Sequence, residues 1–169
     1  MEKAYEANPN DVYFLNNKGY SLESIGEYEE AVKYYEKANK IDPLFSPAWF
    51  GKGCALRKLH RFMEAIECFD NASRNNSNLM AQCYGNKSLC LLNLDQVEEA
   101  LSEIDKATKK GPNLPEAWLN RASIESLLGM KKESIRSFLQ FFSCVKLISN
   151  RDLYYIRYAI TKIRNLKLI

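Results

Sequence analysis

The stretch "EKAYEANP" at residues 2–9 returns as "EKANKIDP" at residues 36–43, with Glu, Lys, Ala and Pro again in the same order. The two copies lie 34 residues apart, a distance that suits a small structural unit rather than a whole domain. Self-similarity at a fixed period of about 20 to 50 residues is the sequence signature of repeat architectures. We therefore expect this chain to be an array of repeated units.

Four further series of residues follow the same period, and each series largely keeps one size of side chain. The series are Gly19, Gly53, Ser88 and Ala122; Ala31, Ala65, Ala100 and Ser134; Tyr35, Phe69, Ile104 and Phe138; and Ala38, Ala72, Ala107 and Phe141. Within each unit, apolar residues recur every three or four positions, which predicts amphipathic helices. Small residues let two helix backbones approach, and large residues fill the grooves between helices.

A period of about 34 with small, aromatic and proline positions in this order resembles the tetratricopeptide family of helix-turn-helix repeats. The resemblance covers nearly the whole chain and implies an all-α fold, in which antiparallel helix pairs stack into a right-handed superhelical solenoid. We expect helix pairs at residues 12–25 and 28–41, 46–59 and 62–75, 81–94 and 97–109, and 115–128 and 131–148. The turns within the pairs are expected at Gly26, His60-Arg61, Asp95 and Gly129.

The whole chain, residues 1–169, is expected to form a single array. Its predicted parts are residues 1–11, 12–45, 46–80, 81–114, 115–149 and 150–169. The first part matches only the second helix of a preceding repeat, so we expect the chain to be a segment of a longer array. Three regular repeats follow, and then a degenerate repeat with an extended second helix. The last part is expected to be a basic C-terminal capping helix that covers the last apolar face.

Composition and charge exclude several classes of protein. No apolar run approaches the roughly 20 residues that cross a bilayer, and the N-terminus lacks the pattern of a signal peptide. The five cysteines form no CxxC pair, which indicates reduced thiols and a cytoplasmic location. Residues 1–130 carry 15 Lys/Arg and 19 Asp/Glu, whereas residues 131–169 carry 9 and 2, so the C-terminal part is basic.

The sequence offers no catalytic or metal-binding constellation. Its single histidine, His60, falls at a predicted turn, and the cysteines lack the spacing of metal ligands. The stretch "GKGC" at residues 51–54 lacks the full spacing of a phosphate-binding loop and lies inside a predicted helix. We therefore expect no enzymatic activity, no cofactor, no metal and no small-molecule substrate.

In tetratricopeptide arrays the first helix of each pair lines the concave face, so the resemblance places one set of side chains in a groove. An amide recurs at the sixth place of three units, as Asn17, Asn86 and Asn120, while Gly51 takes that place in the other unit. An asparagine amide offers both a donor and an acceptor, and so matches one peptide unit. The predicted peptide-binding residues are Tyr13, Asn16, Asn17, Tyr20, Phe50, Arg57, Lys58, Gln82, Asn86, Leu89, Leu119, Asn120 and Ser123.

These features favour a non-catalytic scaffold that binds an extended peptide or a partner segment in the groove. One alternative is an anionic membrane or nucleic-acid surface bound by the basic residues 150–169, and another is a regulatory segment of a larger enzyme. Membrane and nucleic acid are the less favoured partners. Exposed solenoid ends would allow a homo-oligomer.

A known variant of the family clamps the acidic tails of heat-shock chaperones. It uses basic residues at the second and sixth places of one unit. This chain has Gln82 and Asn86 at those places in its third unit, and Glu116 and Asn120 in its fourth. The missing cations disfavour such a clamp.

Overall fold

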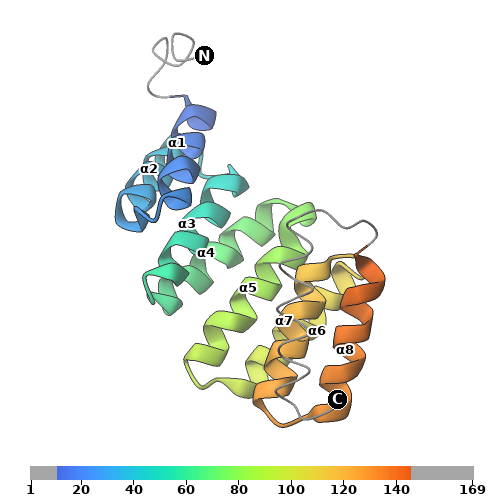
Figure 1. Cartoon of the computed structure of the whole chain (residues 1–169). Coiled ribbons are helices and arrows are strands. Elements are labelled where there is room, and N and C mark those ends of the chain that lie inside the picture. Colours follow the sequence, from blue (N-terminus) through green and yellow to red (C-terminus); the bar gives the residue numbers. More distant parts are fainter. Residues whose placement is uncertain (1–10, 146–169) are drawn as a thin grey trace.

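The computed structural model describes residues 11–145, which form eight α-helices and one short 3₁₀ helix, with no strand among them. Figure 1 shows the helices following one another along the array, with α1 at one end and α8 at the other. The elements are α1 (Val12–Ser24), α2 (Tyr28–Ile41), α3 (Ser46–Lys58), α4 (Phe62–Asn75), η2 (Ser77–Leu79), α5 (Met80–Asn93), α6 (Val97–Lys110), α7 (Pro115–Leu127) and α8 (Lys131–Cys144). The predicted half-repeat before residue 11 and the predicted capping helix at residues 150–169 lie outside the described residues.

The predicted helix bounds agree with the structure to within one residue at each end, apart from the end of α8. That helix stops at Cys144, and Val145 after it has extended backbone with φ −80° and ψ 91°. With 14 residues, α8 has the same length as α2, α4 and α6. The continuous helix expected through residue 148 is therefore interrupted at Val145, and residues 146–149 lie outside the described part.

The turns within the four helix pairs share one backbone conformation. The residue at each turn has a positive φ: 89° at Gly26, 60° at His60, 58° at Asp95 and 74° at Gly129. After each turn a backbone N–H donates to the carbonyl five residues before it: Glu27 to Leu22, Arg61 to Leu56, Gln96 to Leu91, and Met130 to Glu125. This left-handed cap ends the first helix and turns the chain back beside it.

The core follows the four periodic series predicted from the sequence, because every member of those series is buried. The glycines in them allow close helix contact. A Cβ atom on Gly19 would lie 2.8 Å from a ring carbon of Tyr35, and one on Gly53 would lie 2.7 Å from a ring carbon of Phe69. The small series and the aromatic series are therefore two halves of one contact, repeated along the array.

The first helices of successive pairs also contact one another, as α1 with α3, α3 with α5, and α5 with α7. Each second helix contacts its own first helix, and α2, α4 and α6 also contact the first helix of the next pair. The first helices thus share one side of the array, where the groove is predicted.

Ala65→Leu tests the predicted register. Ala65 has no exposed surface, so the larger side chain should separate the helices of the second pair and lower the free energy of unfolding by about 1 to 3 kcal/mol. Urea unfolding measures the change, and Met63→Leu on the same helix is the control because Met63 is 64% exposed. Equal stability of both variants would mean that Ala65 does not sit in the core.

Candidate functional site

A cavity of about 260 Å³ opens along the first helices α3, α5 and α7. Its lining residues are Phe50, Ala81, Gln82, Gly85, Asn86, Leu114, Glu116, Ala117 and Asn120. Four of the predicted groove residues are brought together here: Phe50, Gln82, Asn86 and Asn120. We call this cavity the groove pocket.

The groove pocket is also lined by small and apolar residues that are not among the predicted binding residues, namely Ala81, Gly85, Leu114 and Ala117. Their short side chains leave the space that the larger residues surround. The sequence does contain one sign of this space. Gly85 is the fifth residue of its unit, a groove-facing place that the large Phe50 occupies in the preceding unit.

The two asparagines in the groove pocket differ in how many of their amide groups are left free to bond a ligand. The Nδ2 of Asn86 donates to the backbone oxygen of Gln82 at 2.9 Å, which leaves its Oδ1 and its second N–H. The side chain of Asn120 makes no hydrogen bond within residues 11–145, and its Nδ2 lies 3.6 Å from where a Cβ on Gly85 would stand. Gly85 therefore keeps the space beside Asn120 open.

The break in the asparagine series at Gly51 has a structural cause. A Cβ atom on Gly51 would lie 2.5 Å from Cε1 and 2.8 Å from the hydroxyl oxygen of Tyr35. Tyr35 is 1% exposed, and its hydroxyl donates to Oε2 of Glu23 at 3.0 Å, which fixes the ring against Gly51. No side chain of any kind fits there without displacing the ring.

The four predicted groove residues of α1 lie outside the groove pocket. Tyr13 and Tyr20 are 64% and 68% exposed, and Tyr13 meets the ring of Phe45 edge-on at a centroid distance of 5.1 Å. Asn17 is exposed and Asn16 is half-buried. These side chains form a separate exposed surface at the α1 end of the array.

The remaining predicted groove residues are spread along α3, α5 and α7. Leu89 and Ser123 are half-buried and do not line the groove pocket. Leu119 is a correction: it is 7% exposed and packs with Phe138 and Phe141 in the core. It belongs to the same apolar cluster as those two aromatic residues of α8, so it contributes to the core rather than to an open groove wall.

Arg57 and Lys58, at the end of α3, bring positive charge toward Glu23. Burial raises the pKa of the Glu23 carboxyl above its ordinary value. The hydrogen bond from Tyr35 and the charges of Arg57 and Lys58 offset only part of that rise. The Nε of Arg57 is buried and has no hydrogen-bond partner among the described residues. This part of the array carries cations, whereas the one charged residue that lines the groove pocket among residues 11–145 is Glu116.

The buried thiols show no sign of reactivity. Burial raises the pKa of Cys54 and Cys83 to about 12, and that of Cys68 and Cys90 to about 11. Because the thiolate is the nucleophile, these cysteines remain protonated and inert at neutral pH.

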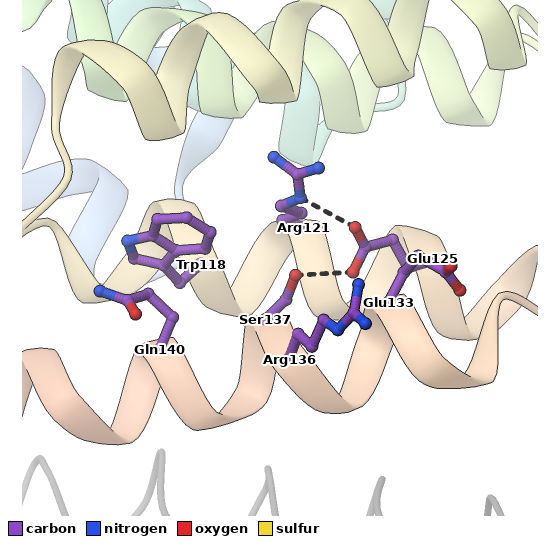
Figure 2. Close-up of a pocket in the computed structure, with 7 residues that line it drawn as sticks. All are labelled: Trp118, Arg121, Glu125, Glu133, Arg136, Ser137 and Gln140. Carbon is purple, nitrogen blue, oxygen red and sulfur yellow. Dashed lines mark hydrogen bonds and ion pairs between the residues drawn. The ribbon is translucent and has the colours of Figure 1, made fainter.

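A second cavity, of about 340 Å³, lies between α7 and α8 and was not predicted (Figure 2). Its central charges are already paired. Glu125, 2% exposed, accepts from Nε of Arg121 at 2.8 Å and from the hydroxyl of Ser137 at 2.6 Å. Arg121 also pairs with Asp105 at 2.7 Å. This arrangement is a structural network whose central charges are satisfied, and the guanidinium of Arg121 lies over the ring of Trp118 at 5.9 Å.

Residues 11–145 contain no group of three His, Cys, Asp or Glu side chains that could hold a metal ion. Within the same range no helix is long and apolar enough to cross a membrane. His60 is exposed at a turn, where its left-handed backbone closes the α3 cap.

Comparison with known families agrees with the geometry. One tetratricopeptide repeat model matches residues 12–43, and a second matches residues 34–67. Residues 12–67 therefore belong to the tetratricopeptide repeat family. Ser134 and Phe141, which replace the alanines of the earlier units, lie well beyond the matched range.

Two curated relatives share part of the array. The chain is 41% identical over 56 residues to uncharacterized protein MJ0572 of Methanocaldococcus jannaschii, covering 33% of this chain and 65% of that protein. It is 36% identical over 67 residues to small glutamine-rich tetratricopeptide repeat-containing protein 2 of Mycosarcoma maydis, covering 40% and 19%. The match therefore spans less than two thirds of the length of either relative.

Two solved structures share the tetratricopeptide fold. YrrB, described as a TPR protein with an unusual peptide-binding site, is 26% identical with a TM-score of 0.65, over 85% of this chain and 73% of that one. The first TPR of Spaghetti (RPAP3), solved with the HSP90 peptide SRMEEVD, is 24% identical with a TM-score of 0.63, over 70% and 93%. The repeats and these neighbours support a protein-interaction module.

Proposed function

We propose that the chain holds an extended segment of a partner protein in the groove along its first helices, with Asn86 and Asn120 bonding the backbone of that segment. The observation that carries the proposal is the groove pocket, which places equivalent amides of two successive repeats on one cavity wall. The peptide-binding description of YrrB supports the same kind of ligand for a similar array.

Backbone recognition suits the chemistry of the groove pocket. A peptide unit offers one N–H donor and one carbonyl acceptor, and a side-chain amide carries the complementary pair. Within residues 11–145 no hydrogen bond engages the side chain of Asn120, and Asn86 keeps its oxygen and one N–H. Phe50 adds an apolar wall, so affinity would come from backbone bonds and preference from the side chain placed beside Phe50.

The groove pocket does not favour an acidic chain terminus. Among residues 11–145 its lining contains no Lys or Arg, and its one charged residue is the carboxylate of Glu116. Carboxylate recognition relies on Arg or Lys donors, which are lacking here. We therefore expect no appreciable binding of the peptide SRMEEVD, which the related RPAP3 domain holds.

The double variant Asn86→Ala with Asn120→Ala tests the proposal. Ligands are first selected from a random peptide library displayed on phage, and their affinities are then measured by calorimetry. Each lost hydrogen bond is worth about 0.5 to 1.5 kcal/mol, so binding should weaken by about tenfold. Methylation of the ligand's backbone nitrogens should weaken binding as well, because the amides contact the backbone.

Asn93→Ala is the matched control for the double variant. Asn93 lies on the same helix as Asn86, and its Nδ2 makes the same bond to the carbonyl four residues earlier, Leu89, at 2.8 Å. It does not line the groove pocket. Ligands that bind the double variant and the control equally well would contradict the proposal.

The main alternative is an anionic surface bound by residues 150–169, which lie outside the described residues. Binding that rests on phosphate charge falls steeply with salt. A ligand whose affinity drops steeply between low and physiological salt, and is unaffected by the double variant, would favour the basic segment.

A further inference from the structure

Three ion pairs, one at each junction, join each helix pair to the next, and they connect equivalent places of the units. They are Lys52 with Glu36 at 2.9 Å, Lys87 with Asp70 at 2.8 Å, and Arg121 with Asp105 at 2.7 Å. We call them the inter-repeat ion pairs. In each, the cation is the seventh residue of a unit and the acid is the twenty-fifth residue of the unit before it.

The inter-repeat ion pairs are built into the contacts between units. Their cations come from the first helices α3, α5 and α7, with side chains that are 18%, 19% and 29% exposed. Their acids come from α2, α4 and α6, the second helices of the preceding units. Each pair bridges two helices of different units. It therefore favours one alignment of those two helices along their length.

The first unit carries an unmatched member of this series. Lys18 is the seventh residue of its unit, is exposed, and makes no ion pair within residues 11–145. The twenty-fifth place of a preceding unit falls on Glu2, because "EKAYEANP" at residues 2–9 repeats "EKANKIDP" at residues 36–43. Glu2 precedes Glu36 by the same 34 residues by which Lys18 precedes Lys52.

We propose that the face of α1 bearing Lys18 is a docking surface for residues 1–10 of this chain, and that Glu2 pairs there with Lys18. Charge complementarity and register point to the same occupant: a carboxylate at the twenty-fifth place, as in the three inter-repeat ion pairs. Residues 1–10 lie outside the described part of the chain. The proposal does not depend on peptide binding in the groove.

A second copy of the chain fits this surface less well. If α8 of one copy stacked on α1 of another, the twenty-fifth place opposite Lys18 would hold Leu139, which is 63% exposed. An apolar side chain offers the ammonium no partner. The residue types at the two ends therefore select against head-to-tail stacking and in favour of residues 1–10.

Zero-length cross-linking of the full chain tests this contact. A carbodiimide joins a carboxylate to an amine as an amide only where the two groups touch, and it takes up the released water as its urea. Peptide mapping by mass spectrometry should find Glu2 linked to Lys18 in the monomer. The pairs Glu36–Lys52 and Asp70–Lys87, at 2.9 Å and 2.8 Å, serve as internal controls.

Two results would overturn the proposal. One is linkage of both control pairs without any link between Glu2 and Lys18. The other is a link that forms only between copies, which a mixture of isotopically labelled and unlabelled protein would reveal by its mixed peptides.

A charge swap gives an independent measurement. Lys18→Glu should place two carboxylates together and lower the melting temperature by about 2 to 4 °C. Glu2→Lys in the same chain should restore at least half of that loss, as Glu36→Lys should for Lys52→Glu one repeat later. Purely additive effects of the two changes at Lys18 and Glu2, with rescue at the control pair, would show that these residues do not meet.

Discussion

Gly51→Asn, which completes the asparagine series, should destabilise the protein by about 1 to 3 kcal/mol or more instead of improving its groove. The added Cβ would overlap the buried ring of Tyr35. That ring cannot move away easily, because Gly19 also packs closely against it and Glu23 accepts a hydrogen bond from its hydroxyl at 3.0 Å. Urea unfolding followed by circular dichroism measures the loss.

Gly85→Ala is the control for Gly51→Asn. The nearest atom to a Cβ on Gly85 is Nδ2 of Asn120 at 3.6 Å, an ordinary contact distance. Alanine is favoured over glycine inside a helix by about 0.5 to 1 kcal/mol, so this variant should be as stable as the parent or more so. If Gly51→Asn also kept full stability, the ring of Tyr35 would not occupy the space above Gly51.

Much of the fold could be predicted because the repeat period encodes helix contacts. A small residue such as Gly53 and a large one such as Phe69 recur together, since each fills the space that the other leaves. The turns were equally visible. Gly26 and Gly129 suit a positive φ, and His60 and Asp95 hold the same turn position in their own units.

The limits of the groove could not be predicted, because they depend on neighbours that are distant in sequence. The sixth place of the second unit holds Gly51 because Tyr35, 16 residues earlier, fills it from another helix. Leu119 occupies a place that the resemblance assigns to the groove, but it is buried in one apolar cluster with Phe138 and Phe141. The spacing of residues in the sequence predicts which face of a helix a side chain lies on. It does not predict the size of the side chain that packs against that face from another helix.

The cations of the inter-repeat ion pairs recur in the sequence, but their recurrence alone does not reveal that they form ion pairs. Lys18, Lys52, Lys87 and Arg121 recur at the repeat period, and on a single helix they would pass for solvated charges. Their meaning depends on knowing that α2, α4 and α6 each contact the next first helix. Only that contact brings an acid of one unit to a base of another.

Arg121→Leu should have the largest effect among these variants, with a loss of about 3 to 5 kcal/mol in the free energy of unfolding. Arg121 is the cationic partner of Glu125, whose 2% exposure leaves the carboxylate no access to water. Without the guanidinium, the hydroxyl of Ser137 remains as its only hydrogen-bond donor within residues 11–145. Guanidinium chloride unfolding at neutral pH measures the loss, since a charge buried without its partner is the costly species.

Removing Glu125 together with Ser137 should change the stability only slightly, because other units lack the acid at the equivalent place. Leu56 and Leu91 stand where Glu125 does, and Cys68 stands where Ser137 does in the second unit. Glu125→Leu with Ser137→Cys rebuilds that arrangement and leaves Arg121 paired with Asp105, as Lys52 is with Glu36. We expect it to stay within about 1 kcal/mol of the parent, because removing a buried charge together with its hydrogen-bond donor leaves nothing unpaired. If Arg121→Leu and the double variant lowered the free energy of unfolding equally, the attraction between Arg121 and Glu125 would itself provide the stability. The cost of burying the Glu125 carboxylate without its partner would then not be the cause.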